Sequence, residues 1–167
     1  MAKITLGGNP VHTSGEMPKI GQKAPDFKLI SSDLKEVGLR DFRGKKLVMN
    51  VFPSIDTQVC AASVRMFSKA ATTLDNTIVI HISRDLPFAH KRFCATEGLE
   101  NVMSLAEFKD HQFGQQYGLD MVDGNFAGLL SRAVLVLDEN GQVLYTEQVP
   151  EIGEEPDYDA ALAALNA

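Results

Sequence analysis

The sequence predicts an α/β fold whose sheet has parallel crossovers and also carries an antiparallel hairpin. Residues 46–52 and 77–82 are short, mainly apolar, β-branched runs, as expected of central strands that are covered on both faces. Each run is followed by a segment with helical signals. Towards the C-terminus, two further apolar runs flank an Asn-Gly pair, which is a strong hairpin signal.

The N-terminal part is expected to form a hairpin and one short strand. Residues 4–6 and 11–13 flank the turn-rich spacer Gly7-Gly8-Asn9-Pro10, which predicts a hairpin that decorates the main sheet. A loop that contains Pro25 then leads to a short strand at residues 27–30.

The central part predicts a buried strand that is followed at once by a helix. Pro53 cannot continue the strand at 46–52. After it, apolar side chains recur at alternating steps of four and three, which is the spacing of one helical face. They are Cys60, Val64, Phe67, Ala71 and Leu74. Asp56 or Thr57 can cap this helix, so Cys60 heads its inward face.

The remaining elements follow from turn and cap residues. A strand at 77–82 is followed by a short helix at 88–93 that begins near Pro87, ends near Cys94 and is stopped by Gly98. A helix at 110–117 ends at Gly118. Strands at 133–137 and 142–146 flank the turn at 138–141, and a helix at 156–165 closes the chain. This order fits a thioredoxin-like α/β fold with an N-terminal β-hairpin extension.

Composition points to a single domain over residues 1–167 and excludes several functions. The chain is 44% hydrophobic, and no linker composition divides it. A net charge of −6 argues against nucleic acid or an anionic membrane as the main partner. The first residues lack a secretory apolar core, and no run approaches the ~20 apolar residues of a membrane span, so the cytoplasm is the expected location.

Cys60 is the candidate nucleophile. The first backbone N–H groups of a helix have no intrahelical partner, and the helix dipole favours an anion there, which at this position would be a thiolate. Cysteines in such settings can titrate well below the ~8.5 of a free thiol. The spacing alone also fits a small buried apolar residue, so both interpretations remain open at this point.

The residues around Cys60 resemble a known active site. The pattern P-x-x-x-T-x-x-C, filled here by Pro53, Thr57 and Cys60, is similar to the signature of the peroxiredoxins. Residues 52–57, 59–65, 85–89, 92–94 and 155–162 together resemble the bacterial thiol peroxidase subfamily, and the likeness spans essentially the whole chain. The helical placement of Cys94 is what narrows the resemblance to this subfamily.

The resemblance implies a thiol-dependent peroxidase without a cofactor or a metal. Cys60 would attack a hydroperoxide and become a sulfenic acid, and Cys94 would resolve it as a disulfide within one subunit. The Thr57 hydroxyl, the Cys60 N–H and the Arg132 guanidinium would contact the peroxide oxygens, and Pro53 would shield the sulfur. Without the resemblance Arg132 would count as a solvated strand end, and Arg65 is its rival.

The resemblance also implies partners and movement. Thioredoxin is the implied reductant of the disulfide, and a homodimer is the implied assembly. Both cysteines are predicted on helices, whereas a disulfide needs Cα atoms within about 7 Å. We therefore expect the first turn of the Cys60 helix and the 88–94 segment to loosen on oxidation.

Four apolar residues near the signature are candidates for a substrate pocket that suits alkyl or lipid hydroperoxides. They are Phe52, Ile55, Leu86 and Phe88. The same residues could instead belong to the core.

Two other classes of function compete with the peroxidase. His90 and Cys94 are spaced i, i+4, and Cys60 with His81 could complete a metal site, although paired close spacings are missing. A disulfide reductase or an inert thioredoxin-fold module is the second alternative, and the absence of C-x-x-C argues against the reductase. His12 and His111 are expected at the surface.

Overall fold

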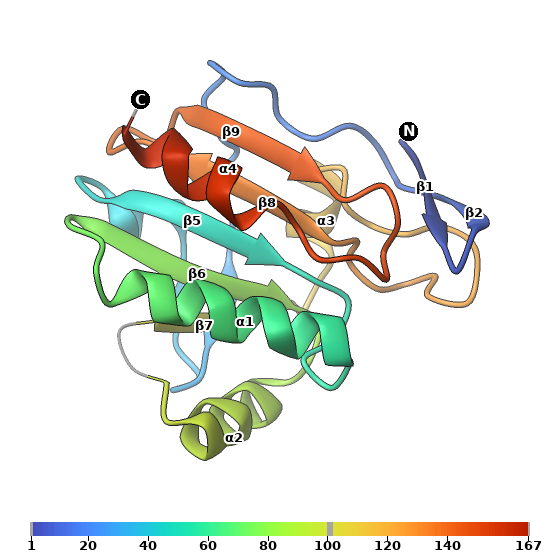
Figure 1. Ribbon diagram of the computed structural model, residues 1–167, viewed down its shortest axis with the longest axis horizontal. Helices are drawn as coiled ribbons and strands as arrows, with labels where there is room; N and C mark the ends of the chain where they lie inside the picture. Colours follow the sequence, from blue (N-terminus) through green and yellow to red (C-terminus); the bar gives the residue numbers. More distant parts are fainter. Residues whose placement is uncertain (1, 100–101, 167) are drawn as a thin grey trace.

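The computed structural model describes residues 2–99 and 102–166, and its main feature is a seven-stranded mixed sheet (Figure 1). The strands lie in the spatial order β4 (Glu36–Val37), β3 (Leu29–Ser31), β7 (Val102–Ala106), β6 (Thr77–Ser83), β5 (Lys46–Val51), β8 (Ala133–Leu137) and β9 (Val143–Gln148). The pairs β5·β6 and β6·β7 are parallel, and the other pairs are antiparallel. The predicted combination of parallel crossovers and a hairpin is confirmed.

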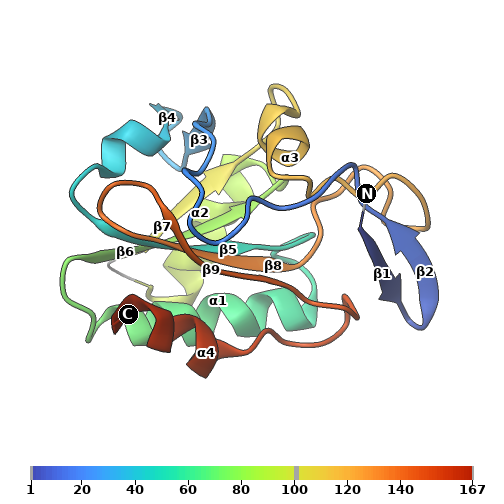
Figure 2. The same ribbon diagram turned by 90° about the horizontal axis from the view of Figure 1, so that it is seen from above.

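Helices cover both faces of this sheet. They are η1 (Leu39–Phe42), α1 (Gln58–Ala71), α2 (Pro87–Glu97), α3 (Gln112–Gln116), α4 (Tyr158–Ala163) and η2 (Ala164–Asn166). Figure 2 shows α1 and α4 on one side of the sheet and α3 on the other. No helix in the described part of the chain has the length and the apolar character that a membrane crossing requires.

Alternating side chains of the central strands divide the core into two layers. Val48 and Val79 pack with Phe67 of α1 on one face. Met49 faces the opposite way and belongs to the layer that contains Phe113 of α3. Because side chains in a strand alternate between faces, one central strand supplies both layers. The apolar runs at 46–52 and 77–82 have this role.

The N-terminal hairpin is confirmed as β1 (Lys3–Leu6) and β2 (Asn9–His12), which form a separate two-stranded sheet. Gly7 and Gly8 both have positive φ, +59° and +83°, as a two-residue type I′ turn requires. The hairpin joins the main body through a bridge between Thr5 and Glu151. It therefore lies beside the main sheet at one end of the molecule (Figure 2).

Several predicted boundaries need correction. The strand expected at 27–30 lies at Leu29–Ser31, and β4 and β7 were not predicted at all. The helix expected at 88–93 is longer and runs on to Glu97. Its apolar residues do not form a stripe along one face, so its length could not be inferred from the sequence. The helix expected at 110–117 is shorter, at Gln112–Gln116. The last helix begins at Tyr158 instead of 156.

The turn and stop residues behave as expected. Gly98 caps α2 with a φ of +64°, and Gly118 follows α3 with a φ of +66°. In the β8–β9 turn, the Asp138 carboxylate accepts the N–H groups of Asn140 (2.8 Å) and Gln142 (2.9 Å), while Gly141 supplies a φ of +80°. The predicted hairpin is confirmed, with Gln142 still in its turn and β9 extending to Gln148.

Candidate active site

Cys60 lies at the third position of α1, just after the carboxyl end of β5. The first i to i−4 hydrogen bond of the helix joins the Ala61 N–H to the Thr57 carbonyl (3.0 Å). The Cys60 N–H comes before this bond, among the first N–H groups of the helix, which have no partner within it. The Cys60 side chain is fully buried, as is the Pro53 side chain before it. A hydroperoxide can therefore reach the sulfur only if neighbouring side chains shift.

Thr57 occupies the N-cap position of α1, but its side chain does not cap the helix. Its hydroxyl donates to the Ser54 carbonyl at 2.9 Å. Because the single hydroxyl hydrogen is used there, the Thr57 oxygen can accept a hydrogen bond from a peroxide O–H but cannot donate one. In the contact with a peroxide that the resemblance implies, Thr57 would therefore be the acceptor and not a donor.

Arg132 is the cation beside the sulfur. Its Nη2 lies 3.2 Å from Cys60 Sγ, and its Nε donates to the Ile152 carbonyl at 2.7 Å. The side chain is only 2% exposed, and its Nη1 has no hydrogen-bond partner. Arg132 therefore presents one buried donor to the thiol and a second, unpartnered donor.

Strand pairing explains how a residue 72 positions away reaches Cys60. β8 pairs antiparallel with β5, and Ala133 lies opposite Val51 at the end of β5. Arg132, one residue before β8, is thereby carried to the place where the chain turns towards α1. The rival Arg65 is half-exposed and forms a bidentate ion pair with Glu97 (2.8 and 3.0 Å).

A buried polar network supports the first turns of α1 from below. The Ser63 hydroxyl donates to the Cys60 carbonyl (2.8 Å) and accepts from the Asn50 amide (3.2 Å). The same amide lies 3.1 Å from His81 Nδ1, and His81 Nε2 lies 3.1 Å from the Ser68 hydroxyl.

Burial, reinforced by His90, lowers the pKa of His81 to about 3. His81 is therefore neutral near pH 7. Sequence reasoning missed this network, because its members look like ordinary strand and helix residues.

Cys94 lies on α2 and is not a member of the apolar cluster that contains Cys60. Its Sγ is 3.6 Å from the Ser104 hydroxyl of β7, and it lines a groove of about 600 Å³. Its neighbour Phe93 packs instead against the cluster that contains Cys60. Both cysteines are free thiols in this structure.

The four predicted pocket residues do not share one environment. Phe52 and Ile55 are buried, at 0% and 2% exposure, in the cluster around Cys60. Leu86 and Phe88 are exposed, at 49% and 65%. The structure does not bring these four residues into one pocket, because the loop after β5 turns inwards whereas Leu86 and Phe88, on either side of the buried Pro87, face solvent.

The histidines do not assemble a metal site with the cysteines. Both ring nitrogens of His81 have hydrogen-bond partners, and His90 Nε2 lies 3.0 Å from the Ser83 hydroxyl. Across residues 2–99 and 102–166, no three His, Cys, Asp or Glu side chains are grouped so that they could hold a metal ion. His12 pairs with Asp123 at 2.7 Å, and His111 is exposed.

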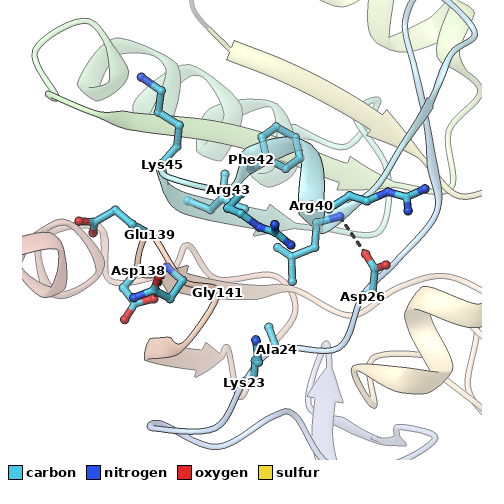
Figure 3. Close-up of a pocket in the computed structure, with 13 residues that line it drawn as sticks. Lys23, Ala24, Asp26, Arg40, Phe42, Arg43, Lys45, Asp138, Glu139 and Gly141 are labelled. Carbon is cyan, nitrogen blue, oxygen red and sulfur yellow. Dashed lines mark hydrogen bonds between the residues drawn. The ribbon is translucent and has the colours of Figure 1, made fainter.

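A separate cavity of about 470 Å³ opens near the start of β5 and the β8–β9 turn (Figure 3). Its lining mixes the basic Lys23, Arg40, Arg43 and Lys45 with acidic groups and contains no cysteine. The cavity lies near the first residues of β5, whereas Cys60 follows the last residues of that strand. The cavity is therefore at the opposite end of the strand and is not part of the thiol site.

Comparison with known proteins decides the family. A family model described as Redoxin matches residues 19–162, and a thiol peroxidase of Corynebacterium glutamicum is 53% identical over 99% of this chain and 100% of its own length. The chain belongs to the redoxin family, among its thiol peroxidases. A thiol peroxidase of Mycobacterium tuberculosis is 52% identical over the whole of both chains.

The fold agrees with this membership. A crystal structure of a peroxiredoxin-like protein from Aquifex aeolicus superposes with a TM-score of 0.92 at 34% identity, covering 98% of this chain and 95% of that one. The predicted thioredoxin-like fold is confirmed. As a thiol peroxidase, the protein is an oxidoreductase with a thiol-dependent peroxidase activity of the kind that serves antioxidant defence.

Replacing Arg132 by lysine should slow oxidation of Cys60 by about 100-fold, because a single ammonium cannot serve Ile152, Cys60 and the peroxide together. The measurement is the second-order rate constant of thiol loss with hydrogen peroxide. Arg65→Lys is the matched control, and because its ion pair is exposed it should change that constant by less than about threefold. A larger effect at Arg65 than at Arg132 would contradict this prediction and would identify Arg65 as the cation that assists oxidation of Cys60.

The buried neutral His81 should make the protein less stable in acid. Its pKa is about 3 in the folded chain, against an ordinary value of 6.5, so the unfolded chain binds one more proton between these values. The free energy of unfolding should fall by about 1.4 kcal/mol per pH unit from this group as pH drops below 6.5. Urea unfolding at pH 7 and pH 5 measures the loss.

His81→Gln should lose less stability than the wild type between these two pH values, by about 2 kcal/mol. His12→Gln, at the exposed pair with Asp123, serves as the control and should follow the wild type. Parallel pH profiles for the wild type and His81→Gln would contradict the assignment of a neutral buried imidazole.

Proposed function

We propose that Cys60 is the peroxidatic cysteine of a single catalytic domain and that Arg132 and Thr57 are its partners in catalysis. The observation that carries this proposal is the buried contact of 3.2 Å between Arg132 Nη2 and Cys60 Sγ, beside a second guanidinium nitrogen that has no partner. A buried cation next to sulfur favours the thiolate, which is the nucleophilic form. Pro53, buried in the same loop, keeps bulk water from the sulfur.

The first half-reaction is a displacement at oxygen. A sulfur electron pair of Cys60 attacks the terminal oxygen of ROOH, and the O–O bond breaks. Its electron pair stays on the leaving oxygen, which takes a proton and departs as alcohol or water. The Thr57 oxygen accepts the O–H of the substrate, while the Cys60 N–H and the free Arg132 nitrogen face the charge that develops.

The second half-reaction uses Cys94. Its thiol attacks the Cys60 sulfenic acid, water leaves, and a disulfide forms within one chain. A dithiol protein, thioredoxin, then reduces this disulfide and restores both thiols. Because the cycle depends on a reducing compartment, a cytoplasmic location is part of the proposal.

Formation of the disulfide requires α2 to move. Its Cys94 points into a groove beside β7, whereas Cys60 is enclosed at the start of α1. We expect the first turn of α1 and residues 88–94 to loosen together, because neither thiol can reach the other while both helices are packed.

Apolar hydroperoxides are the preferred substrates in this proposal. With Phe52 and Ile55 in the core, the exposed Leu86 and Phe88 are the apolar groups that remain near the active-site loop. They can contact the alkyl part of a substrate that approaches the sulfur.

The same two residues support a homodimer. Exposed large apolar side chains that lie next to each other mark interaction surfaces more often than isolated ones do. Leu86 and Phe88 flank the first residue of α2, close to the loop of the peroxidatic cysteine. A second copy of this chain is the partner that the family resemblance implies for that surface.

One equivalent of cumene hydroperoxide should remove both thiols of the reduced wild type and lower its intact mass by two hydrogens. Cys60→Ser should keep its remaining thiol and its mass. Cys94→Ser should gain one oxygen as a sulfenic acid. Thiol titration and intact mass spectrometry are applied to all three proteins. The second-order rate constants of thiol loss in the wild type with cumene hydroperoxide and with hydrogen peroxide give the substrate preference.

Retention of both thiols in the wild type would contradict the peroxidase cycle. A mass gain in Cys60→Ser would move the nucleophile to Cys94. A rate constant for cumene hydroperoxide that is no greater than that for hydrogen peroxide would remove the apolar-substrate part of the proposal and leave the cycle intact.

Sedimentation equilibrium of the reduced protein should give twice the mass of one chain, and Phe88→Lys should lower it to the mass of one chain, because a charge cannot be buried in an apolar interface without a partner. Ile20→Lys is the matched control. Ile20 is 64% exposed, against 65% for Phe88, but its neighbour Gly21 bonds to the edge strand β9, whereas α2 packs against β7. A dimer that survives Phe88→Lys would rule out this surface.

A further inference from the structure

Asp85 lies in the connection between β6 and α2 and binds the loop that leads to Cys60. Its Oδ2 accepts the Ile55 backbone N–H at 2.7 Å, and its Oδ1 accepts the Ser54 hydroxyl at 2.8 Å. Oδ2 also accepts the Ser83 hydroxyl, from the end of β6, at 2.5 Å. Three donors from two segments therefore converge on one partly buried carboxylate, and hydrogen bonds to a charged acceptor are roughly twice as strong as neutral ones.

The loop passes this restraint on to Thr57. Ser54 donates its hydroxyl to Asp85, and its carbonyl accepts both the Thr57 hydroxyl (2.9 Å) and the Thr57 N–H (3.2 Å). The direction of the Thr57 oxygen is thus set by Ser54, and the position of Ser54 is set by Asp85. Thr57 is also the N-cap residue of the helix that carries Cys60.

Asp85 is connected to α2 as well. The Ser83 hydroxyl, which donates to Asp85, lies 3.0 Å from Nε2 of His90, one of the two buried residues of α2. Since the hydroxyl hydrogen goes to the carboxylate, His90 Nε2 is the donor in its contact with Ser83. Asp85 itself stands two residues before Pro87, the first residue of α2. A displacement of α2 from its N-terminal end therefore displaces the carboxylate.

We propose that Asp85 is a positioning residue that holds residues 54–57 in the arrangement that peroxide oxidises, and that it releases this loop when α2 leaves. This inference rests on the proposed function of Cys60 and Cys94 and adds a residue to it. Asp85 touches neither sulfur. It acts through Ser54 on Thr57, and through the chain on Cys94.

The proposal predicts opposite effects on the two half-reactions. In Asp85→Asn the charge is lost and one oxygen is replaced by a donor, so the loop and α2 are held less firmly. Oxidation of Cys60 should slow by about tenfold, the equivalent of one charge-assisted hydrogen bond. Formation of the disulfide from the sulfenic acid should become faster, by about threefold or more. Less of the protein should then reach the sulfinic acid at high peroxide.

Acid-quenched samples from a rapid-mixing experiment separate the two steps by intact mass. The sulfenic acid adds one oxygen, the disulfide removes two hydrogens, and the sulfinic acid adds two oxygens. The first rate is proportional to peroxide concentration and the second is independent of it. Reduced wild-type protein and Asp85→Asn are compared in the same buffer with hydrogen peroxide.

Two further variants keep the test decisive. Asp123→Asn makes the same chemical change at an exposed carboxylate that pairs with His12, and it should leave both rates at their wild-type values. Ser54→Ala removes one of the three donors without altering the charge, and should shift both rates in the same directions as Asp85→Asn but by less. It also replaces Asp85→Asn in the test if that variant does not fold.

Rates that fall together, rates that rise together, or a change in only one rate would each overturn the inference, because the proposal requires the two rates to change in opposite directions. Failure of the proposed function has a different signature, since the wild type itself would then form neither the sulfenic acid nor the disulfide. The wild type therefore tests the cycle, and the ratio of variant to wild type tests Asp85.

Discussion

A buried guanidinium next to a buried cysteine is the constraint on which the rest of the site depends. Arg132 is 2% exposed, and within the described chain no carboxylate lies within salt-bridge distance of it. A cation removed from water without an anion is strongly unfavourable. The Ile152 carbonyl supplies a dipole, and Cys60 is the group that can supply a negative charge. Arg132 therefore depends on the Ile152 carbonyl and the Cys60 sulfur as its hydrogen-bond acceptors.

A row of buried polar side chains lies on the face of the sheet that α1 covers, beneath Cys60. Asn50 of β5 lies in register with His81 of β6, and His81 with Ser104 of β7. One end of this row reaches the Cys60 carbonyl through Ser63, and the other end reaches the Cys94 sulfur. Most buried polar groups are hydrogen-bonded, and the contacts of this row favour one packing of both helices on the sheet, although the Asn50 Oδ1 atom has no partner.

Local signals allowed the Cys60 helix and the central strands to be predicted, because Pro53 and the apolar spacing after it act over a few residues. Arg132 could not be found in that way, since its position depends on the pairing of β8 with β5. Without the family resemblance it looked like a solvated strand end. The position of Ser54, which accepts the Thr57 hydroxyl, depends on the distant Asp85, and the inward turn of Ile55 depends on packing with other elements. Strand β7 was missed for the same reason, because its neighbours β6 and β3 determine it.

The distribution of burial indicates which parts of the site would yield in the proposed disulfide step. Seven residues of α1 are buried, whereas only Pro87 and His90 are buried in α2. The ion pairs that tie α2 to α1 and to its loop, Arg65–Glu97 and Arg92–Asp56, are exposed, and such pairs contribute only about 0 to 1 kcal/mol each. Detaching α2 therefore costs far less free energy than detaching α1. In the proposed cycle Cys60 would need only its own first turn to unwind, because the buried residues from Val64 onwards keep the rest of α1 on the sheet. The cycle can thus proceed by local opening while the core that supports Arg132 stays intact.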